Sequence, residues 1–272
     1  MKETPCLLCS SPAKHLMNDE ILNKYRIDYY QCTDCECIFT EKPYWLEEAY
    51  SEAISFLDTG IMLRNQSICN EVMLILNQFF TPTAKVVDFG AGYGILTRML
   101  RDNGVDAYWY DTYSKNLLCR GFDYDGVSKA DVFLAFEVVE HLPNPLETIR
   151  DIMSKTDCFI FSTDLLEQPT YSSNKDWWYF VRESGQHIFL SSRKSMLKLA
   201  EIIGCQYSYI NGLHILHRHE KITKTNIWLR GKSLFWKAVT RITRYLMYSW
   251  NYKSKVWTDN QMLKDKFNKE AV

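Results

Sequence analysis

The sequence predicts an α/β protein whose largely parallel sheet ends in an antiparallel hairpin. Between residues 85 and 218, short apolar runs alternate with segments of helical pattern, and strands that alternate with helices form parallel sheets. Only Asn211-Gly212 separates the last two apolar runs, and a two-residue turn of this kind joins antiparallel strands. A pair of cysteine motifs precedes this region and a basic segment follows it.

The expected elements follow one another in regular order. Residues 41–84 form a helical connector, because apolar residues recur at helical spacing from 68 to 79 until Pro82 ends the pattern. We expect this connector to cover one face of the sheet. The later elements are strands at 85–90, 107–111, 131–137, 158–163, 205–210 and 213–218, and helices at 94–102, near 114–120, at 145–154 and at 192–203.

Composition places the chain among globular proteins. Its 272 residues are enough for one sizeable α/β domain and a smaller module. No apolar run approaches the roughly 20 residues of a membrane span, and the first residues lack the apolar core of a signal peptide. We therefore expect a cytoplasmic protein, in which the nine cysteines serve metal binding rather than disulfides.

Two C-x-x-C pairs predict a zinc ribbon over residues 1–40. Cys6 and Cys9 form the first pair, and Cys32 and Cys35 form the second after 22 intervening residues. Each pair can turn two thiolates toward one point, so two pairs supply a closed tetrahedral site for a structural Zn²⁺. Cys37 competes as a ligand, His15 is a weaker substitute, and ordinary buried thiols are the alternative.

The segment 85–94, KVVDFGAGYG, has the pattern of a ligand-binding turn between a strand and a helix. Its glycines stand at 90, 92 and 94, where a sharp bend and a close approach of a ligand to the backbone both exclude a Cβ. This G-x-G-x-G spacing differs from the G-x-G-x-x-G of dinucleotide dehydrogenases. Asp111 ends the next strand, and its carboxylate could accept two hydroxyl protons at once.

Together, VVDFGAGYG, Asp111, the strand-end segment FEVVEHLPNP and the terminal hairpin resemble the class I S-adenosylmethionine-dependent methyltransferases over residues 60–218. The resemblance implies a Rossmann-like seven-stranded methyltransferase sheet and S-adenosylmethionine as cofactor. Asp88 would then face the cofactor's ammonium group or orient the loop, and Asp111 would hold the ribose hydroxyls. The cofactor-binding residues implied are Asp88, Gly90, Ala91, Gly92, Gly94, Asp111, Phe136, Glu137 and Val138.

His187 is the candidate general base, because a hydroxyl acceptor must lose a proton when it is methylated. It lies in an aromatic segment with Trp177, Trp178, Tyr179 and Arg182, and aromatic faces with polar edges suit a sugar. A loop histidine satisfied by the backbone is the alternative. His141 is read first as structural, and a metal site among the alternating histidines 214, 217 and 219 is not expected.

The combination of ribbon and methyltransferase domain resembles bacterial enzymes that methylate nucleotide-linked sugars or surface glycans. In the related deoxysugar C-methyltransferases a glutamate precedes the histidine, whereas this chain has Gln186. We therefore expect methylation of a sugar hydroxyl within a domain spanning residues 85–220. Deoxysugar C-methylation, methylation of RNA or protein, and a non-catalytic cofactor-binding scaffold are the alternatives.

Residues 221–272 form a basic tail. They hold twelve Lys and Arg against three Asp and Glu, a net charge of +9, which leaves residues 1–220 at −10. Aromatic and aliphatic residues interleave with the basic ones, a pattern typical of helices that lie on a membrane surface. We expect residues 221–250 either to contact the inner membrane face or to pack on the acidic body or on a second subunit. Nucleic acid is disfavoured by that acidic body.

Overall fold

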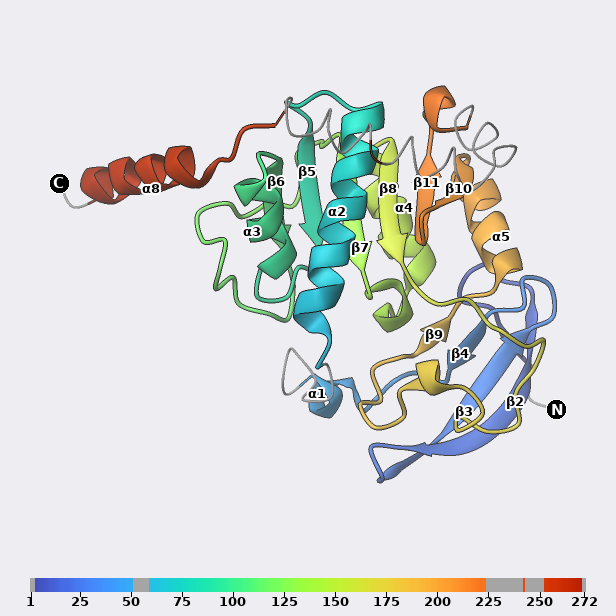
Figure 1. Cartoon of the computed structure of the whole chain (residues 1–272). Helices are drawn as coiled ribbons and strands as arrows, with labels where there is room; N and C mark the ends of the chain where they lie inside the picture. The colour runs from blue at the N-terminus through green and yellow to red at the C-terminus, as the bar shows by residue number, and fades with distance from the viewer. Residues whose placement is uncertain (1–2, 51–58, 224–241, 243–251, 271–272) are drawn as a thin grey trace. The chain divides into compact units, whose positions relative to one another are not determined.

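The computed structural model describes residues 3–50, 59–223, 242 and 252–270 (Figure 1). Its contacts divide the chain into two compact units. Residues 1–55 and 135–218 form the first, here called the ribbon unit, and residues 56–134 and 219–272 form the second, the glycine-loop unit.

A six-stranded sheet has the order β10-β11-β8-β7-β5-β6. Strand β5 pairs in parallel with β6 and with β7, whereas β11 is antiparallel to both β8 and β10. The strands are β5 (Lys85–Phe89), β6 (Asp106–Tyr110), β7 (Val132–Phe136), β8 (Cys158–Ser162), β10 (Gln206–Ile210) and β11 (Leu213–His217). The α/β class and the mixed sheet are therefore confirmed.

Two details of the predicted sheet are wrong. The described residues contribute six strands rather than seven, because beyond β6 there is only an isolated parallel bridge between Trp109 and Asp123. The helix expected near 114–120 is also absent, and that segment forms turns. Asn116 explains this locally, since its side chain donates to the Cys119 carbonyl and accepts from the Cys119 amide, and such bonds compete with helix formation.

The terminal hairpin has the predicted turn. Ile210 pairs with Leu213, which leaves Asn211 and Gly212 as the two turn residues, both with positive φ (53° and 87°). Asn-Gly is favoured in such turns because both central residues must adopt the left-handed region.

Helices of the glycine-loop unit pack beside the parallel strands. The helix α2 (Ile61–Phe79) and the helix α3 (Ile95–Asp102) contact each other, and α2 buries every residue from Ile68 to Leu76 except Asn70, all of them apolar apart from Glu71. The helix α8 (Val256–Glu270) belongs to the same unit. Its Asp259 accepts from Nε and Nη2 of Arg101 at 2.7 and 2.8 Å, and both side chains are buried.

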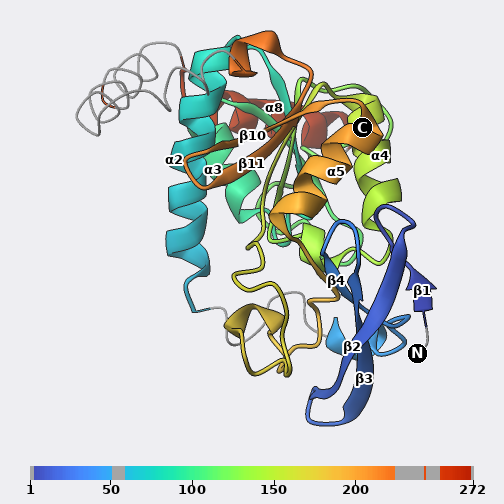
Figure 2. The ribbon, with the colours of Figure 1, turned by 90° about the vertical axis from the view of Figure 1, so that its right-hand side faces the viewer.

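The ribbon unit contains a second, antiparallel sheet of order β1-β2-β3-β4-β9 (Figure 2). Its members are β1 (Glu3–Pro5), β2 (Pro12–Ile21), β3 (Tyr25–Cys32), β4 (Ile38–Thr40) and β9 (Phe189–Leu190). The fifth strand thus comes from a part of the chain about 150 residues after the other four. A core of buried aromatic and aliphatic side chains from residues 17–49 and 171–190 lies beneath this sheet.

The remaining helices of the ribbon unit are short. They are α1 (Leu46–Ala49), the 3₁₀ helix η1 (Val139–His141), α4 (Pro145–Lys155), the 3₁₀ helix η2 (Trp178–Phe180) and α5 (Arg193–Ile203). Ser192 begins α5 with a capping box, since its hydroxyl accepts from the Ser195 amide and Ser195 reciprocates.

Most of the predicted basic helix lies outside the described residues. The apolar residues that interleave with its basic ones are Trp228, Leu229, Leu234, Phe235, Trp236, Ile242 and Leu246. Of these, the structure describes only Ile242, which is exposed. Among the described helices, none combines the length and the apolar character that crossing a membrane requires.

The Arg101–Asp259 pair predicts how α8 is held. Asp259→Ala leaves the buried Arg101 guanidinium without its carboxylate, so we expect a loss of about 3–5 kcal/mol in unfolding free energy, measured by urea denaturation. Asp265→Ala is the matched control, because Asp265 lies on the same helix, is exposed and accepts a hydrogen bond from the side chain of Gln261. Equal stability of the two variants would show that α8 is not held by this pair.

Candidate active site and metal centre

The glycine loop leaves space beside its backbone. Gly90, Gly92 and Gly94 all have positive φ. A Cβ added at Gly92 would meet nothing within 4 Å, whereas one at Gly94 would press on Trp109, Asn116 and Cys119 at 3.3–3.4 Å. Gly94 therefore allows tight packing at the start of α3, and Gly92 keeps an open position where a ligand can approach.

Asp111 closes the loop from the end of β6. Its Oδ2 accepts from the Gly92 amide at 2.9 Å, and its Oδ1 accepts from the amides of Tyr113 and Ser114 at 2.8 and 2.7 Å. A carboxylate has about four acceptor positions, so these three bonds leave capacity for a further donor. The structure therefore brings Asp111 and Gly92 together, and their contact with a cofactor stays a prediction.

Asp88 is buried at the end of β5 and faces α3. Its Oδ2 accepts from the hydroxyl of Thr97 at 2.7 Å. The pKa of Asp88 is raised to about 7. Burial is the main cause, the hydrogen bond from Thr97 opposes it, and the negative charge of Asp111 adds to it. Asp88 thus carries a carboxyl group that a nearby cation would return to the ionised form.

The cofactor-binding candidates fall in both units. Gly90 and Ala91 both donate their amides to the Tyr110 carbonyl, at 2.8 and 3.1 Å, and so hold the loop against β6. Phe136 ends β7, Glu137 and Val138 follow it in the ribbon unit, and all three are half-buried. Their contact with a cofactor stays a prediction.

Glu137 has a strained backbone at the end of β7. Its φ of 54° is unusual for a residue with a side chain, and such strain concentrates at functional positions. Ser162 fixes the side chain by donating to Oε1 at 2.6 Å, and it also accepts from the Glu137 amide at 3.0 Å. The sequence gives no local signal for this conformation.

Tyr179 connects two carboxyl groups. Its hydroxyl lies 2.7 Å from Oε1 of Glu140 and 3.3 Å from Oε2 of Glu137. Glu140 is completely buried, and burial together with the charge of Glu137 raises its pKa well above the usual value. Oε2 of Glu140 has no hydrogen-bond partner among the described residues. The role of Tyr179 in joining these groups was not predicted from the sequence.

His187 is oriented by the backbone of the same tyrosine. Its Nδ1 lies 2.7 Å from the Tyr179 carbonyl, so Nδ1 carries the proton and Nε2 has the free electron pair. Burial lowers the pKa of His187 to about 4, against the raising effects of that carbonyl and of Glu137. The imidazole is therefore neutral at physiological pH, and its pKa lies below the near-neutral value that suits a general base.

His141 packs edge-on against His187, with ring centroids 4.9 Å apart. The Tyr50 hydroxyl lies 3.0 Å from its Nδ1, and the backbone of Gln186 holds the ring. Burial lowers the pKa of His141 well below its usual value. One atom from each of Glu140, His141 and His187 lies within 4.8 Å of the others.

The aromatic segment is mainly a core rather than a sugar-facing surface. Trp177 and Tyr179 are buried among residues of the antiparallel sheet, whereas Trp178 is 69% exposed. Gln186, which stands where the C-methyltransferases have glutamate, donates to the Ala49 carbonyl at 2.7 Å. Arg182 contacts Glu183 at 3.2 Å. Of Trp177, Trp178 and Tyr179, only Trp178 therefore presents an exposed aromatic face.

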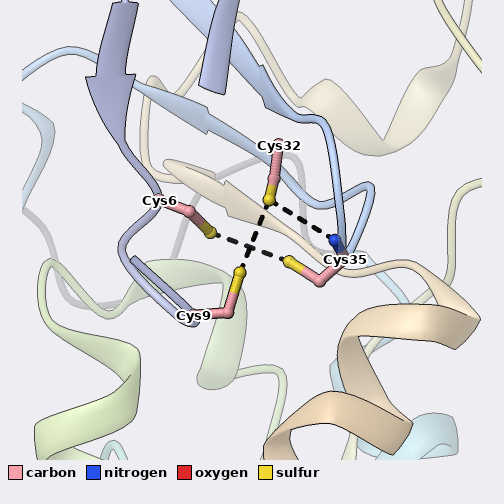
Figure 3. Close-up of side chains that lie close together, drawn as sticks. All are labelled: Cys6, Cys9, Cys32 and Cys35. Atoms are coloured by element: carbon pink, nitrogen blue, oxygen red, sulfur yellow. Dashed lines mark hydrogen bonds between the residues drawn. The ribbon is translucent and has the colours of Figure 1, made fainter. Parts of the chain in front are cut away.

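The four predicted cysteine ligands converge (Figure 3). Sγ of Cys6 lies 3.7 Å from Sγ of Cys35, and Sγ of Cys9 lies 3.5 Å from Sγ of Cys32. Four thiolates about 2.3 Å from a tetrahedral Zn²⁺ would be about 3.8 Å apart, so the cluster fits the ion. Amides of Leu8 and Cys35 point at the sulfurs of Cys6 and Cys32 at 3.4 Å.

The other candidate ligands named from the sequence lie outside the group of four converging cysteines. Cys37 lies 3.5 Å from the sulfurs of Cys6 and Cys35, but it is not among the four that converge. His15 contacts Asp28 at 3.1 Å instead. His214 and His217 contact the Thr163 carbonyl and the Ser208 hydroxyl, at 3.0 and 2.9 Å, which gives these two strand histidines structural partners.

The raised pKa of Asp88 predicts that the stability of the folded protein depends on pH. In ligand-free protein its pKa is about 7, against roughly 3.9 in the unfolded chain. The folded state therefore retains a proton that the unfolded state loses, and this contribution to stability is lost as the pH rises from about 4 to about 7. Asp88→Asn removes this titration and should be more stable than the parent above pH 7 by up to about 4 kcal/mol, with little difference below about pH 4.

Urea unfolding across this pH range checks the prediction. Asp151→Asn is the control, because Asp151 is exposed and its ion pair with Lys155 lies on the surface of α4. A constant difference between Asp88→Asn and the parent at all pH values would contradict a raised pKa at Asp88.

Part of the chain is similar to known methyltransferases. A family model described as a methyltransferase domain matches residues 63–209. No curated protein matches the chain. Among solved structures, the magnesium protoporphyrin IX methyltransferase from Synechocystis PCC 6803 with bound SAH is 15% identical, with a TM-score of 0.44 over 63% of this chain and 90% of that one. The mitomycin 7-O-methyltransferase MmcR is 14% identical, with a TM-score of 0.43 over 63% and 59%.

The family model spans more than half of the chain, and its span contains the glycine loop, Asp111 and most of the mixed sheet. The chain therefore belongs to the methyltransferase domain family.

Proposed function

We propose that this methyltransferase transfers a methyl group from S-adenosylmethionine to a hydroxyl of a sugar, in a nucleotide sugar or a surface glycan, with His187 as general base. The observation that carries the base assignment is the 2.7 Å contact between Nδ1 of His187 and the Tyr179 carbonyl. It fixes the tautomer in which Nε2 can accept a proton.

The glycine loop supports the cofactor assignment. Gly92 leaves open space where the backbone can meet a ligand, and Asp111 retains acceptor capacity for vicinal hydroxyls. S-adenosylmethionine, when bound, supplies a methyl group on a sulfonium that is displaced in line. Asp88, which is buried and has a raised pKa in the ligand-free protein, is the residue we assign to the cofactor's positive end.

The acceptor hydroxyl becomes an ether in the reaction. Its oxygen forms a bond to the methyl carbon as the bond from carbon to sulfur breaks, and its proton passes to Nε2 of His187. Glu137 supports the resulting imidazolium, since its negative charge raises the pKa of His187. The Tyr179 carbonyl keeps the ring oriented throughout.

The sugar class rests on the resemblance of the whole chain, ribbon included, to sugar and glycan methyltransferases. Gln186 favours oxygen over carbon as the acceptor, because its amide is already bonded to the Ala49 carbonyl and an amide cannot act as a base. Contact of residues 221–250 with an anionic membrane surface is part of the proposal and rests on the charge of +9 across residues 221–272.

A substrate screen tests the proposed activity. Nucleotide sugars and glycan extracts are incubated with the full chain and methyl-labelled S-adenosylmethionine, and products gaining one methylene mass are sought by mass spectrometry. For the acceptor found, His187→Gln should lower kcat by about 10²–10⁴-fold, while calorimetry shows unchanged S-adenosylmethionine binding. Asp111→Ala should weaken that binding instead.

His15→Gln is the matched histidine control, because His15 is exposed and lies outside the cluster around Tyr179. Labelling of RNA or protein but of no sugar would contradict the substrate class. S-adenosylmethionine binding that is unaffected by Asp111→Ala would contradict the cofactor assignment. Full activity of His187→Gln would contradict the base.

We also propose that Cys6, Cys9, Cys32 and Cys35 hold a structural Zn²⁺. The convergence of their four sulfurs supports this ion, and a closed set of four thiolates leaves no position for a substrate. The ion would join the turn that carries Cys6 and Cys9, which precedes β2, to the turn that carries Cys32 and Cys35, which precedes β4.

Purified protein should contain about one zinc per chain, and Cys32→Ser should lose it. Chelation should release the core around Trp45 and Trp177, seen as a change in tryptophan fluorescence, because these buried rings pack beneath the sheet that the knuckles support. Cys205→Ser is the control, since this half-buried cysteine lies outside the cluster. Absence of zinc in metal analysis would overturn the ribbon.

A further inference from the structure

A second group of metal-ligating side chains lies apart from the four cysteines. Glu140 and His141 belong to the short helix η1, and His187 comes from the loop before β9. One potential ligand atom from each lies within 4.8 Å of the other two. Two imidazoles and one carboxylate are the donor set of many three-ligand sites for divalent transition metals.

Packing alone does not account for Glu140. Its side chain is completely buried, and Oε2 has no hydrogen-bond partner among the described residues. Oε1 is engaged by the Tyr179 hydroxyl. A buried carboxyl group in this position either keeps its proton or faces a cation, because an isolated buried carboxylate is strongly disfavoured. An orphaned oxygen beside two histidines is where such a cation would bind.

Both histidines are prepared as ligands by their neighbours. His187 donates its Nδ1 proton to the Tyr179 carbonyl, the outer contact typical of metal-ligating histidines, so Nε2 is available. His141 is held by the Gln186 backbone, and the Tyr50 hydroxyl at its Nδ1 would yield that nitrogen to an ion.

We propose that Glu140, His141 and His187 form a binding site for a divalent transition-metal ion such as Zn²⁺ or Co²⁺. The consequence for activity rests on the proposed function. The ion takes the nitrogen of His187 to which we assign proton acceptance, so metal binding and general-base catalysis exclude each other. Binding of the ion therefore inhibits methyl transfer, and its removal restores it.

Cobalt is the probe for this site. Co²⁺ is titrated into full-length protein whose cysteine site already holds zinc, and the visible absorption of the cobalt is followed. We expect a band that saturates at about one equivalent without the thiolate charge-transfer absorption that a cysteine site would give. Glu140→Gln and His187→Gln should each weaken this binding at least about tenfold, whereas His15→Gln should not change it.

Glu140→Gln keeps an oxygen for the Tyr179 hydroxyl, and circular dichroism checks that each variant is folded. No saturable cobalt band, or a band equally present in both cluster variants, would overturn the metal site and leave the base assignment standing. Saturation of the site with unchanged methyl transfer would overturn the inhibition and the proposed base while supporting the site itself. Inhibition that follows cobalt occupancy supports both.

Discussion

The pairing of β9 with β4 is the constraint on which the arrangement around His187 depends. Ile38 pairs with Leu190 and Phe39 with Phe189, and the Thr40 amide donates to the Ile188 carbonyl at 3.0 Å. These bonds begin one residue after the histidine. Because β4 follows directly from the second cysteine knuckle, the position of the knuckle is transmitted through the backbone to the loop that carries the candidate base.

The same loop is held from its other side. Trp45 donates its indole proton to the Gly185 carbonyl at 2.8 Å, and Gln186 donates to the Ala49 carbonyl at 2.7 Å. Ser192, at the start of α5, donates to the Cys35 carbonyl at 2.6 Å. Residues 185–192 therefore have N-terminal partners at both ends. A buried ring that must present one nitrogen to a carbonyl needs such support, and the N-terminal strands provide it.

Much of the fold could be predicted because its signals are local. Glycine spacing defined the loop, Asn211-Gly212 defined the hairpin, and the spacing of the cysteines brought four thiols together. What could not be predicted depends on residues far apart in the chain. The two residues of β9 carry no strand pattern of their own, and Tyr179 reads as one aromatic residue among several until its hydroxyl is seen beside Glu140. The role of Asp259 likewise cannot be inferred from its local sequence, because its partner Arg101 lies far away in the chain.

Burial around His187 also bears on which atom is methylated. A base whose pKa is lowered to about 4 is too weak to remove a proton from carbon before the methyl group arrives. A hydroxyl acceptor makes a smaller demand on the base, because its proton becomes strongly acidic as the oxygen bonds to the methyl carbon and gains positive charge. A weak, well-oriented base can then accept the proton late in the reaction. The environment that lowers the pKa of His187 therefore supports the proposed oxygen acceptor, independently of the glutamine that precedes the histidine.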